Sequence, residues 1–189
     1  MLRFRILRSG TASLLREAHG AALLEFAITL PLLVVFVVGI FDFSGAFSQK
    51  QKIEQAAQEG AIIAGSQPMS DIASGNSNPD SVQPVVTSVF NSLVASGIVT
   101  KGTCVPPGTH THSNLKWTYK ISGCPDDLTI TIDRGWVSVS GPPAAVGTIV
   151  TVVYPYHWRF NSVIQLLFPG AKYAAATKVT ESATVHNQM

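Results

Sequence analysis

The stretch 20–41 reads GAALLEFAITLPLLVVFVVGIF, and it decides how this chain is organised. Within 21–41 the only ionisable side chain is that of Glu25. A helix needs about 20 mainly apolar residues to cross the hydrocarbon core of a bilayer. We therefore predict one transmembrane helix over 21–41. Two further apolar patches, near Val150 and Ile164, are too short to span a membrane.

A cleaved secretory signal peptide is the alternative interpretation of this stretch. Signal peptides have an apolar core of about 7–15 residues, and small residues follow it at the cleavage site. Here the apolar run is longer, and its best small-residue junction, between Gly20 and Ala21, comes before the run. Ala46 and Ala57 offer a later cleavage site, but the sequence favours a retained membrane anchor.

Basic residues near the ends of a span indicate its orientation, because Lys and Arg are enriched on the cytoplasmic side. Four arginines precede the stretch and two lysines closely follow it: Arg3, Arg5, Arg8 and Arg16, then Lys50 and Lys52. We predict a single-pass protein of a bacterial inner membrane, with a cytoplasmic N-terminus and a periplasmic C-terminal domain. The formal net charge is only +2 and no basic stripe follows the leader, so we predict no nucleic-acid partner.

The chain has two cysteines, Cys104 and Cys124, and both lie in the part predicted to be exported. In an oxidising compartment such a pair usually forms a disulfide, which we predict here. His110 and His112 lie between the cysteines and suggest zinc, but their spacing lacks the paired short-range pattern of zinc sites. The sequence therefore predicts no metal site and no cofactor.

Beyond the span, the spacing of apolar residues predicts an α+β fold. Helical spacing continues to about Gly65, so one helix over about 22–65 is expected to be half in lipid and half amphipathic. A second helix is expected over about 82–94, then a loop over 100–113 and an antiparallel sheet of about four strands. A short helix or turn is expected at 162–168, between the last two strands. The predicted segments are a basic cytoplasmic leader at 1–20, the helix at 21–64, a linker at 65–80 and the periplasmic domain at 81–189.

Glu25 is the first candidate for a functional residue, because a carboxylate inside hydrocarbon is costly unless it is paired. In a chain that began at Ala21, Glu25 would be the fifth residue and would pair with the free amine of a neighbouring subunit. Such a buried polar contact can fix the axial register of a helical assembly. The alternative is a carboxylate near the cytoplasmic surface that reaches out of the lipid.

The stretch 20–65, which continues from the span as DFSGAFSQKQKIEQAAQEGAIIAG, resembles the signature of TadE-like proteins. These are pseudopilins or minor pilins of the tight-adherence (Flp, type IVc) pilus system. The resemblance implies a pilin-like fold, a processing junction at Gly20 and Ala21 that a prepilin peptidase cuts, and an assembly role for Glu25 and Phe26. It also implies contacts with other pilins and minor pilins, with the inner-membrane assembly platform and with membrane lipid. The protein would act in pilus assembly and cell adhesion, from the membrane or from within the extracellular fibre.

Two other function classes remain open from the sequence. The first is an uncleaved single-pass anchor that carries a periplasmic binding or sensor domain, in which Gly20 and Glu25 have no special role. The second is an anchored periplasmic enzyme. No nucleophile elbow, metal-binding HExxH or phosphate-binding loop is present, so we predict that the protein is not an enzyme.

Overall fold

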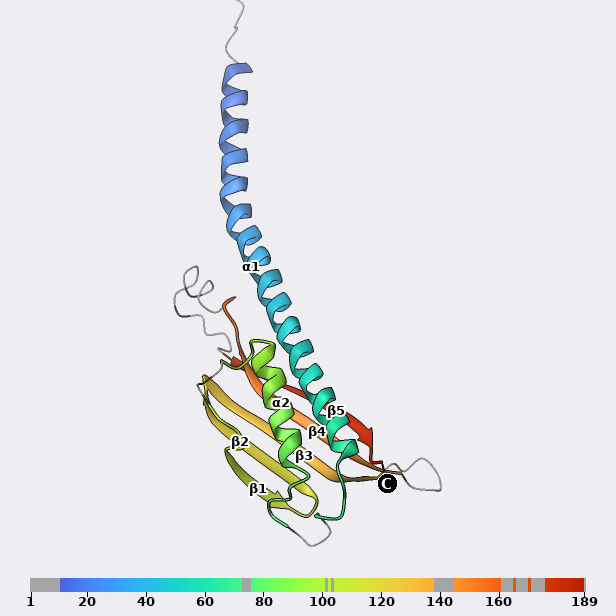
Figure 1. The fold of residues 1–189 in the computed structure, drawn as a ribbon. Coiled ribbons are helices and arrows are strands. Elements are labelled where there is room, and N and C mark those ends of the chain that lie inside the picture. Colours follow the sequence, from blue (N-terminus) through green and yellow to red (C-terminus); the bar gives the residue numbers. More distant parts are fainter. Residues whose placement is uncertain are drawn as a thin grey trace, which may run out of the picture. The chain divides into compact units, whose positions relative to one another are not determined.

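The computed structural model describes residues 11–72, 76–100, 102, 104–137, 145–160, 165, 170 and 176–188. It confirms the predicted α+β class, with a long apolar N-terminal helix, a second helix and an antiparallel sheet (Figure 1). The elements are α1 (Thr11–Ser66), α2 (Gln83–Ala95), β1 (Thr109–Ser113), β2 (Lys116–Cys124), β3 (Asp126–Val137), β4 (Val146–His157) and β5 (Ala176–His186).

Some boundaries differ from those expected from the sequence. The helix α1 begins at Thr11 rather than near residue 22, because 11–19 holds strong helix formers and no proline. Gly20 is the one glycine between Thr11 and residue 22, and it costs a helix only about 1 kcal/mol. The described sheet has five strands rather than about four, since β1 occupies part of the expected loop. Apart from Gln165, the short helix or turn expected at 162–168 lies outside the described residues.

The strands form one antiparallel sheet in the order β1-β2-β3-β4-β5. Alternate residues of β3, from Leu128 through Ile130 to Ile132, are fully buried, and the residues between them face outward. The register of β3 against β4 shifts between Asp133 and Trp136. One register row of the outward face crosses all five strands with hydroxyl side chains: Thr111, Thr118, Thr131, Thr151 and Ser182.

The second helix and the C-terminal half of α1 cover the inward face of the sheet (Figure 1). Large buried residues of α2 contribute most of the helical side-chain volume: Val85, Val86, Val89, Phe90 and Leu93. The buried residues of α1 are mostly small: Ile53, Ala56, Ala57, Ala61 and Ala64. A Cβ atom added at Gly60 would lie 2.4 Å from Cγ2 of Val89, so α1 and α2 approach each other more closely than any larger residue at this position allows.

The chain divides into two compact units, and α1 contributes to both. The first unit comprises Met1–Phe43 and Phe160–Tyr173, and the second comprises Ser44–Arg159 and Ala174–Met189. The helix–sheet core described above belongs entirely to the second unit.

Arg134 of β3 is fully buried and holds the C-terminal end of α1 against the sheet. Its Nη2 atom donates to the carbonyl oxygens of Ala64 and Gln67, at 3.1 and 2.8 Å. Its Nη1 atom donates to the carbonyl oxygen of Pro68 at 3.0 Å and to Oγ of Ser81 at 2.9 Å. The last carbonyl groups of a helix have no partner within the helix and carry partial negative charge. The guanidinium of Arg134 therefore caps α1 from the sheet.

Asp71 lies close enough to this cap to interact electrostatically with Arg134. Burial opposes ionisation of its carboxyl, but hydrogen bonds from Ser81, among them a backbone N–H at 2.8 Å from Oδ2, and the charge of Arg134 leave its pKa below the usual value. Burial lowers the pKa of Arg134, and the negative charge of Asp71 partly offsets this lowering. The turn after α1 is thus held by a carboxylate and a guanidinium that stay ionised at neutral pH.

Candidate functional site: the apolar half of α1

The apolar half of α1, residues 20–41, presents large apolar side chains that nothing in the described part of the chain covers. Within the helical stretch Gly20–Ser66, an 18-residue window has a mean hydropathy of 2.6 and no buried residue. The most exposed large side chains of this half are Leu23, Leu24, Phe26, Ile28, Phe36, Ile40 and Phe41. Contiguous apolar surface on this scale marks an interaction with a membrane or with other proteins. By length and composition, this helix is able to cross a membrane.

Glu25 is an exposed residue of this surface. Neither of the two ion pairs among the described residues includes its carboxylate. Its backbone carbonyl accepts a hydrogen bond from Oγ1 of Thr29 at 2.7 Å, so the side chain of Thr29 is satisfied locally. Phe26, the next residue, is 63% exposed. The pair thus stands on the helix surface, where a second chain can reach it.

Gly20 and Ala21 lie inside α1, nine and ten residues after its first residue, Thr11. Both are exposed. A Cβ atom added at Gly20 would meet no other atom within 4 Å, and Gly20 is not among the glycines with a positive φ. Neither the packing nor the backbone conformation of this fold therefore requires glycine at position 20.

Gly45 and Gly65 of α1 differ from Gly20, because each lies against another element. Gly39, within the apolar stretch, is like Gly20, since a Cβ atom added there would meet no other atom within 4 Å. A Cβ atom at Gly45 would lie 2.7 Å from Oη of Tyr156 in β4. At Gly65 it would lie 3.0 Å from Cγ1 of Val185 in β5. The packing of the domain explains glycine at positions 45 and 65, and it leaves Gly20 and Gly39 unexplained.

Polar contacts fix the part of α1 that follows the apolar half onto the last two strands. Nζ of Lys50 lies 3.5 Å from Oε1 of Glu181 in β5. Nε2 of Gln49 donates to the carbonyl oxygen of Pro155 in β4 at 3.0 Å. The polar residues of this part of α1 therefore serve contacts within the domain, whereas the apolar residues before them remain uncovered.

Cys104 and Cys124 are joined by a disulfide in the structure, as the sequence predicts. This bond ties the loop before β1 to the end of β2.

His110 and His112, the alternative zinc ligands, project from β1 onto aromatic rings of β2. Their ring centroids lie 5.4 Å from that of Tyr119 and 5.1 Å from that of Trp117 respectively. Among the described residues, no group of three or more His, Cys, Asp or Glu side chains is arranged to hold a metal ion.

Two residues with specific structural roles, Arg134 and Asp42, were not predicted from the sequence. Arg134 follows three inward-facing apolar residues at alternate positions of β3, so the alternation places a charge in the core. That break in the pattern is a signal for a buried, hydrogen-bonded cation.

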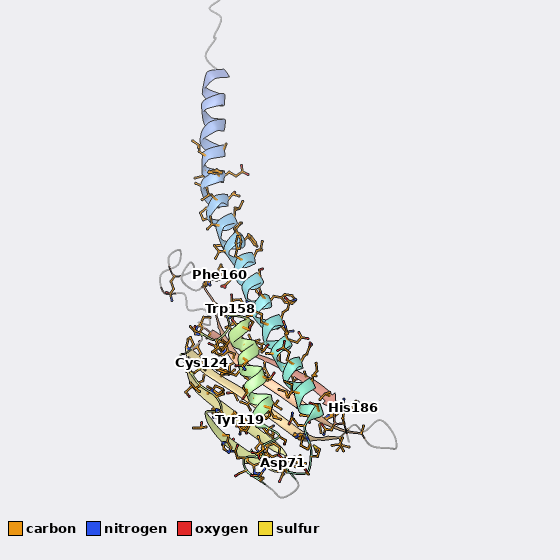
Figure 2. The ribbon with its side chains drawn as sticks, viewed as in Figure 1. Asp71, Tyr119, Cys124, Trp158, Phe160 and His186 are labelled. Carbon is orange, nitrogen blue, oxygen red and sulfur yellow. A yellow bond between two sulfur atoms is a disulfide. The ribbon has the colours of Figure 1, made fainter. Side chains whose placement is uncertain are left out.

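Asp42 directly follows the apolar stretch and is only 4% exposed. Its carboxylate Oδ2 accepts the backbone N–H of Phe160 at 2.7 Å, a contact that no local pattern indicates. Phe160 is labelled in Figure 2.

Comparison with protein families gives a match to TadE-like proteins over residues 20–61. The matched segment comprises the apolar half of α1 and most of the part that packs in the domain, and it agrees with the resemblance found in the sequence. No curated protein and no solved structure matches the chain. The match points to a protein associated with a tight-adherence pilus.

Proposed function

We propose that this chain is a minor pilin or pseudopilin that acts in assembly of a tight-adherence, Flp-type pilus. In this proposal a prepilin peptidase cuts after Gly20 on the cytoplasmic side, and the mature chain begins at Ala21. The observation that supports the proposal most strongly is the exposed apolar half of α1 with Glu25 on it, because this surface coincides with the family match at 20–61.

The unexplained glycine at position 20 also supports processing. A glycine in a helix interior is unfavourable relative to alanine, and it usually has a packing, conformational or functional reason. Here no atom lies near enough to exclude a side chain at position 20. Gly39 is equally open, but it lies within the apolar stretch, and glycine is more frequent in transmembrane helices than in soluble ones. At position 20, where that stretch begins, recognition by a protease that binds the backbone closely supplies a reason for glycine.

In the membrane, Glu25 is the residue that would set the register between subunits. An ionised carboxylate in hydrocarbon is costly, and pairing with the amine of Ala21 in a neighbouring subunit would offset that cost. The remaining apolar side chains of α1 would contact lipid before assembly and neighbouring helices after it. The domain after α1 would lie in the periplasm, where the disulfide between Cys104 and Cys124 is stable.

A comparison of Glu25→Ala with Glu25→Gln tests the role of the carboxylate in assembly. We expect both variants to be processed and inserted normally, since neither changes Gly20 or the apolar stretch. We expect both to reduce the number of pili, counted on cells by electron microscopy, because neither side chain can pair as an ion with an amine. Thr29→Ala is the matched control, since Thr29 lies one turn further along and its hydroxyl bonds only locally. Normal piliation by both Glu25 variants would refute the register role and favour an uncleaved anchored binding domain.

A further inference from the structure

Asp42 marks the level at which the apolar half of α1 ends. Its neighbours Phe41 and Phe43 are 74% and 65% exposed, whereas Asp42 itself is 4% exposed. The residue that bonds to its carboxylate, Phe160, comes 118 positions later in the chain. A segment that follows the fourth strand therefore returns to α1 at the residue where the apolar stretch stops.

We propose that the chain makes a second contact with the membrane at Phe160, in the interface of the leaflet from which α1 emerges. This inference rests on the part of the proposed function in which 21–41 span a bilayer. Each residue of a helix advances about 1.5 Å, so Asp42 lies within a few ångströms of the end of the apolar stretch. Because the backbone N–H of Phe160 is 2.7 Å from Oδ2 of Asp42, Phe160 lies at that same level.

The chemistry of the neighbouring sequence fits the interface between lipid and water. Phe160 is preceded by Trp158 and by Arg159, which is exposed. Tryptophan is enriched in the headgroup region of membranes, and basic side chains are attracted to anionic lipid. The sequence at 163–168 reads VIQLLF, which is apolar but far shorter than the ~20 residues that a span requires.

The buried position of Asp42 is consistent with this arrangement. A carboxylate at the edge of hydrocarbon is stabilised when it accepts a charge-assisted hydrogen bond from a backbone N–H. The bond to Phe160 supplies such a donor and covers the carboxylate, so the helix surface at this level is apolar except for a satisfied polar group. Asp42 is thus a positioning residue that sets the depth of Phe160 relative to α1.

Lipid access to single labelled positions tests this inference. The full chain, with one introduced cysteine carrying an environment-sensitive fluorophore, is reconstituted into vesicles of phosphatidylcholine and phosphatidylglycerol. A fraction of the lipid carries a nitroxide quencher near the headgroup end of the acyl chain. The label is placed at Phe160→Cys and, in a second variant, at the exposed neighbour Arg159→Cys. The two native cysteines are joined in a disulfide and do not react with the label.

Two control positions separate this inference from the proposed span. Phe41→Cys reports whether α1 is inserted, and Thr180→Cys, on the exposed outward face of β5, reports a position held in water. We expect quenching at Phe160 comparable to that at Phe41, quenching at Arg159, and none at Thr180. Quenching at Phe41 alone would overturn the second contact and leave the span intact. No quenching at any position would overturn both.

Substitution of Asp42 tests its positioning role by the same readout. With Asp42→Ala, we expect the quenching at Phe160 to fall while that at Phe41 is unchanged, because the bond that holds Phe160 at the interface is lost. Asp42→Asn keeps an oxygen acceptor and should restore most of the quenching. Equal quenching at Phe160 in the wild type and in Asp42→Ala would contradict the positioning role.

Discussion

Replacement of Arg134 by alanine should destabilise the folded protein by about 3–5 kcal/mol, the range for removal of one partner from a buried charged network. The side chain donates four hydrogen bonds, to the carbonyl oxygens of Ala64, Gln67 and Pro68 and to the hydroxyl of Ser81. Each bond to a charged group is worth about 1.5–3 kcal/mol. The full sum will not be lost, because the bonds to Gln67 and Pro68 are only partly buried and water can replace the donor there.

Urea unfolding of the full chain in detergent micelles, followed by tryptophan fluorescence, measures this loss. We expect Arg134→Lys to lie between the wild type and Arg134→Ala, since one ammonium cannot reach all four acceptors with the geometry of a guanidinium. Lys116→Ala is the control, because Lys116 of β2 is exposed and its loss should change the free energy of unfolding by less than about 0.5 kcal/mol. A loss below about 1 kcal/mol for Arg134→Ala, at an unchanged slope against urea, would refute the capping role.

Two further predictions concern the packing of α1 and the turn that follows it. Gly60→Ala should destabilise the protein by about 1–3 kcal/mol despite the better helix propensity of alanine, because its Cβ would lie 2.4 Å from a methyl group of Val89. Gly20→Ala is the control, because the added Cβ atom would meet no other atom within 4 Å, and it should leave the free energy of unfolding unchanged or raise it. Equal effects of the two substitutions in urea unfolding would contradict the close approach of α1 to α2 at Gly60. The pKa of Asp71 in the folded protein lies below its usual value. Its ionised carboxylate therefore contributes to stability above about pH 4, the usual pKa of Asp in an unfolded chain. This contribution is lost as the pH falls through the lower pKa of the folded protein. Asp71→Asn should therefore flatten the acid limb of the stability profile, and an unchanged limb would show that other carboxyls determine it.

The sequence was sufficient to predict the elements whose signals are local. The length of the apolar run indicates a transmembrane helix. The spacing of apolar residues then continues at 3.6 residues, which predicts helix, and changes to alternation in 115–139, which predicts strand. The cysteine pair and the small residues on α1 were likewise visible as patterns. The strand β1 was missed because THTHS contains no apolar residue, and its conformation is specified by pairing with β2.

The contacts of Arg134 and Asp42 could not be predicted, because they join positions that are remote in sequence. The guanidinium of Arg134 meets residues 53–70 positions away, and Asp42 bonds to a residue 118 positions later. A single sequence shows that a charge interrupts an apolar pattern, but it does not show which carbonyl or N–H satisfies that charge. The roles of Gly20 and Glu25 depend on other molecules, so their assignment stays a proposal.

The central claim is that the chain is processed as a prepilin, and N-terminal sequencing of the mature membrane protein tests it most directly. We predict a mature N-terminus at Ala21 that is lost when the prepilin peptidase is absent and when Gly20 is replaced by leucine. An N-terminus at Met1 in peptidase-competent cells would contradict the claim and leave an uncleaved anchored domain. An N-terminus beyond Phe41 would show a secreted protein and would contradict the membrane assignment as well.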